Sequence, residues 1–190
     1  MSGADEKLID LCERIKDCGR CKLCRGRTQT VFGEGNPNAS VMFVGEGPGR
    51  EEDLQGRPFV GPAGKLLDRM LAAIGLTRAD VYIANVVKCR PPNNRNPEPD
   101  EAEACLPFLR MQYALIRPKI IVCLGSVSAR NLIDPEIRIT RDRGKWIERG
   151  GVSFLLTYHP AALLRDESKK REAWQDLQLL AEKLKSIEIQ

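Results

Sequence analysis

The sequence predicts an α/β fold of three layers, α/β/α, around a mainly parallel central sheet of four strands. Short apolar runs alternate with segments of helical periodicity along the 190 residues, the order that builds a parallel sheet covered by helices. One run, KIIVCLG at residues 119–125, is continuously apolar after its first residue, as expected of a strand buried on both faces. No repeat, low-complexity tract or long linker interrupts the chain, so we expect residues 1–190 to form one domain.

The N-terminal half is predicted to contain two helices and two strands. Residues 4–17 carry apolar side chains at helical spacing. Residues 39–47 (ASVMFVGEG) indicate a strand that runs into a glycine turn, and residues 80–87 (DVYIANVV) indicate a second strand. Between the two strands, residues 63–75 show the apolar spacing of a helix that ends at Gly75.

The C-terminal half begins with a loop. Four prolines make residues 90–100 irregular, and a helix is expected from about Asp100 towards Leu115. The strand at residues 119–125 follows, and then a helix from about Ser126.

A hairpin and a final helix complete the predicted elements. Residues 144–160 are expected to turn at Gly150-Gly151, and the second arm of this hairpin is the last core strand. A helix is predicted from Ser168 onward. Its apolar face is expected to contain Trp174, Leu177, Ala181 and Leu184.

Composition excludes several classes of protein. No apolar run reaches the roughly 18 residues that a membrane span needs. The N-terminus is acidic and lacks an apolar signal core, so we expect no secretion signal and a cytoplasmic location. The net charge of +4 is compatible with an acidic partner without requiring one. Seven cysteines, an odd number, favour metal ligation or burial over a disulfide framework.

The glycine-rich run at residues 44–64 is not a nucleotide-binding loop. In a dinucleotide fingerprint the third glycine would fall on Arg50. In a Walker loop, Leu66 would stand where Ser or Thr must hold magnesium, and Phe59 where the first glycine belongs. Both alternatives fail at residues that the chemistry requires.

Three polar loops follow the carboxyl ends of predicted strands, and these ends are where open α/β sheets bind ligands. The loops bring five side chains to one edge of the sheet. An aromatic ring, an amide, a histidine and carboxylates suit a small, planar, polar ligand. The five residues are Glu46, Glu52, Phe59, Asn85 and His159.

Four motifs occur in order along the chain: GEGPG, GRPFVGPAG, NVVKCRPP and HPAALLR. With the cysteines, they resemble the thermostable-type, iron–sulfur uracil-DNA glycosylases, which are family 4 of the uracil-DNA glycosylase superfamily. The resemblance covers the chain from Cys18 to the C-terminal helix. It implies a uracil-DNA glycosylase-like fold and a repair enzyme that flips uracil out of DNA. The enzyme would hydrolyse the N-glycosidic bond and leave an abasic site, as in base excision repair.

The resemblance also implies roles for the pocket residues. Phe59 would stack on uracil, Asn85 would hydrogen-bond the pyrimidine edge, and the main chain at Glu46 and Gly47 would lie close to the base. His159 would hydrogen-bond uracil O2 and stabilise the charge that develops on the leaving base.

A carboxylate must also orient the water or stabilise the sugar cation. Glu46 and Glu52 are both candidates for this catalytic role. Other branches of the superfamily carry an Asp where this chain has Gly47, so the choice between the two glutamates stays open.

The resemblance places HPAALLR in the DNA minor groove. Leu163 or Leu164 would wedge into the gap left by the flipped base, and Arg165 would contact phosphate. Without the resemblance, an ordinary amphipathic helix start is the favoured interpretation of this segment. Further phosphate contacts are expected from Lys169, Lys170 and Arg171, and from Arg143 and Lys145 beside Trp146.

The cysteines offer two kinds of metal site. CGRCKLC contains two overlapping C-x2-C pairs, and the second pair of cysteines is too widely spaced for a usual zinc knuckle. The resemblance implies a structural 4Fe–4S cluster, with zinc as the alternative and with Cys24 as an alternative to Cys18. Cys12 and Cys123 are expected to be buried as small apolar residues. The implied ligands are Cys18, Cys21, Cys89 and Cys105.

The expected partner is uracil-containing DNA, single- or double-stranded, bound by a monomer. A superfamily member with another damaged-base specificity is one alternative. A covalent, DNA-trapping branch needs a second histidine, and this chain has one. From another class, a non-catalytic nucleic-acid-binding or redox module held by a metal cluster also fits the sequence.

Overall fold

The computed structural model describes residues 3–188 and has a central sheet in the order β1-β3-β2-β4-β6-β5. The four inner strands are parallel and correspond to the four predicted strands. The predicted α/β class with a mainly parallel sheet is confirmed. The inner strands are β2 Val41–Gly45, β3 Tyr82–Asn85, β4 Ile120–Leu124 and β6 Val152–Thr157.

Two short antiparallel edge strands make the sheet larger than predicted. β1 Glu34–Gly35 pairs with β3, and β5 Trp146–Arg149 pairs with β6 as the first arm of the predicted hairpin. The predicted number of four strands is wrong, because the sheet has six. β1 spans only 2 residues, too few for an alternating pattern to appear in the sequence.

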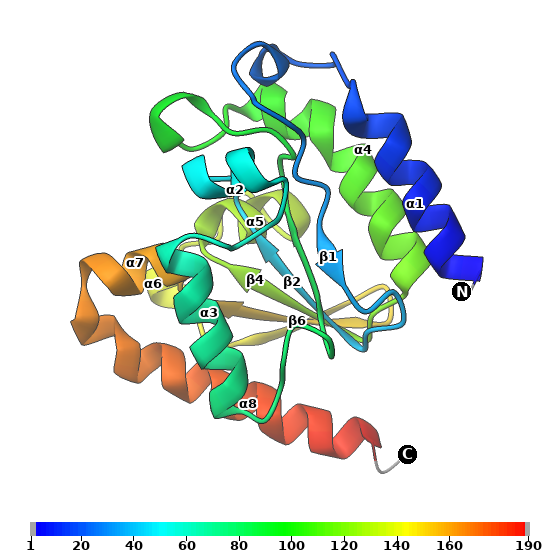
Figure 1. The fold of residues 1–190 in the computed structure, drawn as a ribbon. Helices are drawn as coiled ribbons and strands as arrows, with labels where there is room; N and C mark the ends of the chain where they lie inside the picture. The colour runs from blue at the N-terminus through cyan, green and yellow to red at the C-terminus, as the bar shows by residue number, and fades with distance from the viewer. Residues whose placement is uncertain (1–2, 189–190) are drawn as a thin grey trace.

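Helices cover both faces of the sheet and complete the three predicted layers (Figure 1). The first face carries α1 Gly3–Lys16, α4 Pro99–Ile116 and α5 Ser126–Leu132. The opposite face carries α3 Pro62–Ala73, α7 Pro160–Arg165 and α8 Lys170–Glu188. The connections contain α2 Arg50–Gln55, α6 Ile139–Asp142 and the 3-10 turns η1 Lys22–Arg25, η2 Pro92–Asn94 and η3 Glu167–Lys169. Within residues 3–188, no helix is long and apolar enough to cross a membrane.

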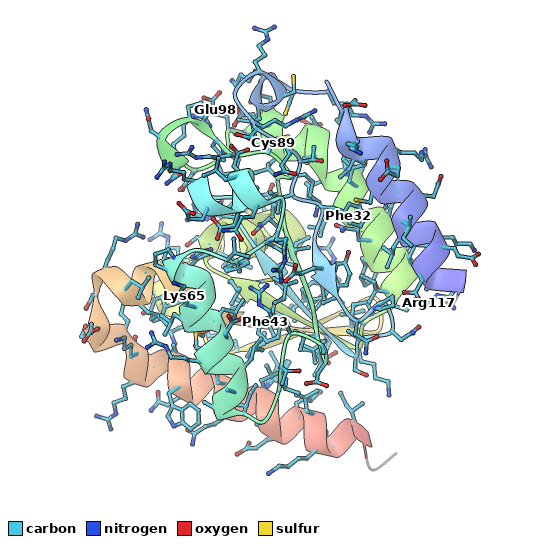
Figure 2. All side chains as sticks on the ribbon, viewed as in Figure 1. Phe32, Phe43, Lys65, Cys89, Glu98 and Arg117 are labelled. Carbon is cyan, nitrogen blue, oxygen red and sulfur yellow. The ribbon has the colours of Figure 1, made fainter. Side chains whose placement is uncertain are left out.

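β2 shows how the core is divided between the two faces. Met42 and Val44 pack with the α1 and α4 side, whereas Val41 and Phe43 pack with the α3 and α8 side. All four are at most 2% exposed, which explains why the inner strands read as continuous apolar runs. Figure 2 shows Phe43 inside the molecule.

The C-terminal helix is present as predicted, and Leu177 and Leu184 of its expected apolar face pack against the core, but Trp174 lies outside the buried face. Trp174 is 41% exposed, and the buried stripe runs through Ala173, Leu177 and Leu180. Asp176 occupies an inward position, where its carboxylate accepts a hydrogen bond from the Thr157 hydroxyl at 2.7 Å. The apolar pattern alone could not place this buried carboxylate within the inner face.

The carboxylate of Asp176 also binds Arg143, which was predicted to contact phosphate. Arg143 donates to both carboxylate oxygens of Asp176, at 2.5 and 3.0 Å, and its side chain is 16% exposed. The prediction that Arg143 contacts phosphate is therefore wrong, because the guanidinium is used inside the protein. Lys145 pairs with Asp142 at 2.9 Å, and Trp146 packs against the core.

Candidate active site

A cleft of about 530 Å³ opens at the carboxyl ends of the parallel strands. The strand register aligns Gly45 with Asn85 at one end of this edge, and Leu124 with Thr157 at the other. The loops that follow these strands therefore meet, as the sequence predicts. The residues of the predicted pocket that line the cleft are Glu46, Gly47, Glu52, Phe59, Asn85 and His159, and Leu164 and Arg165 join them.

Phe59 is held in an unusual backbone conformation beside His159. Its φ of 53° is in the left-handed region, and its ring lies 5.5 Å from the imidazole, centroid to centroid, with 29° between the planes. A Cβ on Gly64 would lie 1.7 Å from the carbonyl oxygen of Phe59. Gly64 therefore has to be a glycine for the chain to form the turn that presents the Phe59 ring.

The glycines of β2 and its loop accommodate the protein's own side chains. A Cβ on Gly45 would lie 2.5 Å from both the Phe59 ring and Asn85 Oδ1, and a Cβ on Gly47 would lie 2.6 Å from Val87. Real Cβ contacts are not this short. Gly47 lines the cleft, but its lack of a side chain is needed first for packing against Val87.

Asn85 ends β3 with its amide inside the cleft. The residue is 2% exposed, and among the described residues its Oδ1 is the one buried side-chain oxygen or nitrogen without a hydrogen-bond partner. Leaving such an acceptor unpaired costs about 1–3 kcal/mol. A buried, unpaired amide at a cleft indicates that a ligand supplies the missing donor.

His159 is a neutral hydrogen-bond donor. Its Nδ1 accepts from the backbone N–H of Ala161 at 3.1 Å, which caps α7 and leaves the ring proton on Nε2. Burial, together with the positive charge of Arg165, lowers the pKa of His159 to about 4. The imidazole is therefore uncharged at neutral pH, with an N–H available to a ligand.

The two predicted catalytic glutamates have different surroundings. Burial raises the pKa of Glu46 to about 7, against the opposing charge of Arg165. Glu52 is 9% exposed, and its Oε1 accepts from the backbone N–H groups of Val60 at 2.9 Å and Gly61 at 2.8 Å. Glu52 thus fixes the turn that carries Phe59.

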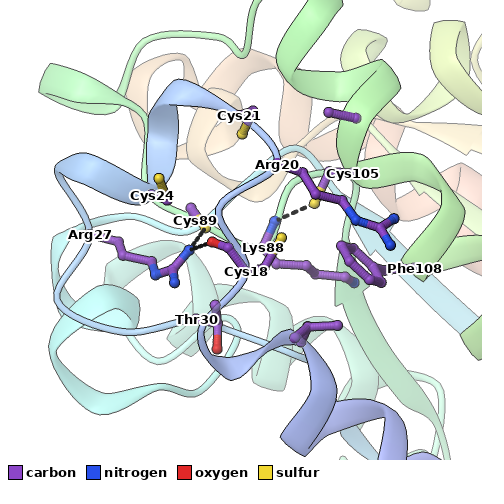
Figure 3. A pocket seen from close by; sticks show the side chains of 12 residues that line it. Cys18, Arg20, Cys21, Cys24, Arg27, Thr30, Lys88, Cys89, Cys105 and Phe108 are labelled. Carbon is purple, nitrogen blue, oxygen red and sulfur yellow. Dashed lines mark hydrogen bonds between the residues drawn. The ribbon is translucent and has the colours of Figure 1, made fainter.

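A second cavity is lined by five cysteines from three separate segments (Figure 3). Arg27 Nη1 donates to Cys89 Sγ at 3.2 Å, and the backbone N–H of Lys88 donates to Cys105 Sγ at 3.3 Å. Among residues 3–188, no three His, Cys, Asp or Glu side chains are close enough to hold a single metal ion. The lining cysteines are Cys18, Cys21, Cys24, Cys89 and Cys105.

Of the other two cysteines, Cys123 is buried as predicted, whereas Cys12 is only partly buried. Cys123 is fully buried in β4, and burial raises the pKa of its thiol to about 12. Cys12 is half-buried against the same core cluster, and burial raises its pKa as well.

Residues 32–178 match the uracil DNA glycosylase superfamily. Over 93% of both chains, the sequence is 49% identical to a type-4 uracil-DNA glycosylase from Archaeoglobus fulgidus. A type-4 enzyme from Thermotoga maritima is 49% identical over 87% of this chain and 88% of that one. A type-5 enzyme from Pyrobaculum aerophilum is 30% identical over 81% and 82%.

The chain belongs to the type-4 uracil-DNA glycosylases. This confirms the resemblance that the four motifs carry. Within this type-4 chain, the cleft and the cysteine cavity lie at two ends of one short segment, because residues 85–89 run from the cleft to the cavity.

α7 separates the two leucines that the sequence left as alternatives. Leu163 is 2% exposed and packs in the core on the α3 side, so the prediction that it could wedge into DNA is wrong. Leu164 is 41% exposed at the cleft beside Arg165. Two of the predicted phosphate contacts are engaged in exposed ion pairs, Lys169 with Asp166 at 3.1 Å and Lys170 with Glu167 at 2.5 Å.

One wall of the cleft was not predicted from the sequence. Pro91, Asn94, Arg95 and Asn96 line it, from the loop predicted only as irregular. The available signal was position, because the loop after β3 is one of the three that the sequence places at this sheet edge, although only Asn85 was named from it. Asn94 also has a φ of 54°, in the left-handed region.

Proposed function

We propose that this chain excises uracil from DNA by hydrolysing the N-glycosidic bond, leaving an abasic site for base excision repair. The unpaired amide of Asn85, in the same cleft as the Phe59 and His159 rings, is the observation that carries this proposal. The bond lies inside the stacked duplex, so the nucleotide must be flipped out to enter the cleft.

Recognition of the base rests on Phe59 and Asn85. The ring of Phe59 offers a stacking surface for a planar base. The Asn85 amide can accept from uracil N3–H through Oδ1 and donate to O4 through Nδ2. Cytosine presents the inverted pattern at these two positions, so it would leave the buried Oδ1 facing another acceptor.

Departure of the base depends on His159. In this proposal uracil leaves as an anion, and the Nε2–H of the neutral imidazole would donate to its O2. A neutral donor with its tautomer fixed by Ala161 needs no proton movement before the bond breaks. Arg165, whose charge opposes protonation of His159, adds positive potential at the same cleft.

Glu46 is the carboxylate that we assign to the water or to the sugar cation. It lines the cleft, and its raised pKa of about 7 is matched to general-base work near neutral pH. Glu52 has one oxygen committed to two backbone N–H groups, so its contribution is to position Phe59.

The cysteine cavity fits a structural 4Fe–4S cluster held by Cys18, Cys21, Cys89 and Cys105. Thiols from three segments line one cavity, and N–H donors approach two of the sulfurs, as is common around such centres. When bound, the cluster would supply thiolate–iron bonds that join the N-terminal segment to the loop after β3 and to α4. Zinc is the alternative metal, and Cys24 is the alternative ligand to Cys18.

DNA is the partner, and we propose that a monomer acts on uracil in single or double strands. Leu164 is the exposed apolar side chain that would fill the gap left by the flipped base. Arg165 would contact phosphate beside it, which makes binding dependent on salt.

An oligonucleotide with one uracil tests the proposal. Incubation followed by alkali should cleave the strand at uracil, and the His159→Ala variant should be slower by ~10²–10³. Retention of the oligonucleotide without cleavage would instead support a metal-cluster nucleic-acid-binding module. Cleavage at another damaged base, with uracil left intact, would support an altered specificity within the superfamily.

A further inference from the structure

Lys88 is a buried cation to which the proposed reaction assigns no role. It is 1% exposed, between the uracil-binding cleft and the cysteine cavity. Its Nζ donates to the backbone carbonyl of Asn85 at 2.9 Å and to Gln112 Oε1 at 2.6 Å. A lysine is rarely buried without a compensating partner, so this arrangement needs an explanation.

The two acceptors of the ammonium are themselves fixed. Gln112 is 0% exposed, and its Nε2 donates to the Phe32 carbonyl at 2.9 Å and to the Tyr82 hydroxyl at 3.2 Å. The carbonyl of Asn85 belongs to the last residue of β3. Lys88 therefore clamps the end of the strand whose final side chain enters the cleft.

The same residue contacts the cysteine cavity. The backbone N–H of Lys88 donates to Cys105 Sγ at 3.3 Å, and the next residue is Cys89. Figure 3 shows Lys88 among the cysteines, with its N–H directed to Cys105 and with Arg27 beside Cys89. Lys88 thus hydrogen-bonds both a thiol and the main chain of Asn85.

The charges also match. Four thiolates around a doubly positive centre, either zinc or an oxidised 4Fe–4S core, leave two negative charges in total. Two cationic residues contact the thiols from inside the protein. Arg27 donates to Cys89 Sγ at 3.2 Å through its guanidinium, whereas Lys88 donates to Cys105 Sγ through its backbone N–H and interacts with the charge of that thiol through its ammonium. Each would lose its countercharge if the metal centre and its thiolates were lost.

We propose that Lys88 is a positioning residue that couples the metal centre to base recognition. The negative charge at the thiolates holds the ammonium in place, the ammonium holds the Asn85 carbonyl, and the Asn85 amide reads the base. This inference rests on the proposed function. It predicts that loss of the metal centre weakens discrimination of uracil from cytosine, although the centre lies outside the cleft.

The test compares four proteins, each with and without its metal centre: wild type, Lys88→Met, Lys88→Arg and the control Lys119→Met. Lys119 is an exposed lysine that precedes β4, at the sheet edge opposite the cleft. Calorimetry gives the affinity ratio for free uracil over free cytosine. Iron, sulfide and zinc contents and the Tm report on the metal centre and on folding.

With metal bound, Lys88→Met should reduce the uracil-to-cytosine ratio about tenfold, because a small displacement of a recognition group is costly. Lys88→Arg should recover part of the ratio, and Lys119→Met should equal wild type. Removal of the metal should reduce the wild-type ratio by a similar factor and should leave the Lys88→Met ratio unchanged. This non-additivity is the signature of a single pathway.

Two results would overturn the proposal: an unchanged ratio in metal-loaded Lys88→Met, or losses that simply multiply when the metal is removed from that variant. If Lys88→Met does not fold, the test compares wild-type protein with and without its metal. Equal uracil-to-cytosine affinity ratios in these two forms would overturn the proposed coupling. Wild-type protein that neither prefers uracil nor excises it would refute the proposed function instead.

Discussion

At the scale of single residues, the cleft holds polar groups in states that cost stability. Asn85 Oδ1 is buried and unpaired, Glu46 resists ionisation, and His159 resists protonation. Each group is poised to interact with a ligand that the folded protein itself does not provide. Perturbed groups gathered in one cleft are a physical mark of a functional site.

Glu46→Gln should change the pH dependence of stability and the rate of excision in different ways. Folding raises the pKa of Glu46 from its ordinary value of 4.5 to about 7, so wild type loses stability as pH rises through this range. The glutamine cannot ionise. The Tm of the variant relative to wild type should therefore increase between about pH 5 and about pH 8.

The same variant should lose the rising limb of the pH–rate profile near pH 7, with excision slower by ~10²–10⁴ if Glu46 is the general base. Glu103→Gln, an exposed glutamate on α4, is the matched control and should keep both the rate and the limb. A rising limb that persists in Glu46→Gln would assign the ionisation to another group.

At the scale of elements, α2 and α7 present side chains to the cleft by different means. α2 supplies Glu52, whose carboxylate holds the turn leading into α3. α7 is capped by His159 and has one leucine in the core and the next in solvent. In each short helix, a residue that stabilises the fold therefore lies next to a residue that lines the cleft, or is itself that residue.

Glu52 can be tested as a residue that positions Phe59. Glu52→Ala leaves the N–H groups of Val60 and Gly61 without their acceptor, which should cost about 1–3 kcal/mol of unfolding free energy and weaken uracil binding. Glu52→Gln keeps an acceptor oxygen and should lose less of both. If the glutamine variant folds like wild type and loses as much activity as the alanine variant, the charge of Glu52 acts in catalysis.

The adjacent leucines of α7 provide a matched pair. Leu163→Ala should lower the unfolding free energy by about 2–5 kcal/mol, because the side chain is buried. Leu164→Ala should leave the Tm within about a degree and should weaken excision from duplex DNA more than from single strands. Equal loss on both substrates would argue against a wedge.

At the scale of the whole molecule, the cysteine cavity joins parts of the fold that are distant in sequence. The thiols come from the segment after α1, from the loop after β3 and from α4. The basic residue between Cys21 and Leu23, Lys22, reinforces this junction by pairing with Glu98 and Asp100 at the start of α4. A metal centre here would stabilise the folded chain because folding brings these thiols into one cavity.

Serine substitutions identify the fourth ligand. Cys18→Ser should reduce the metal content per chain and lower the Tm, whereas Cys24→Ser should leave both close to wild type. Metal analysis and thermal unfolding measure these effects. The reverse pattern would make Cys24 the ligand, and comparable losses in both variants would show that the two thiols share the role.

Features that depend only on neighbouring residues could be predicted from the sequence. The strands and helices follow from apolar periodicity, and the shared edge of the cleft follows from parallel connection. Phe59, Asn85 and His159 could be placed together because each lies at the carboxyl end of a parallel strand or in the loop that follows one. Residues 90–100 continue the loop after β3, which was expected at this edge, but their prolines indicated only irregularity, so none of their side chains was assigned to the cleft.

The sequence by itself determined the order of the elements, the edge where the cleft forms and the cysteines available to a metal centre. Only the tertiary structure decided which side chains are already engaged: Leu163 in the core, Arg143 with Asp176, Glu52 with the Phe59 turn and Lys88 with Asn85. The physical reason is that periodicity and turn chemistry are local. Burial and hydrogen bonding depend on partners that folding brings from elsewhere in the chain.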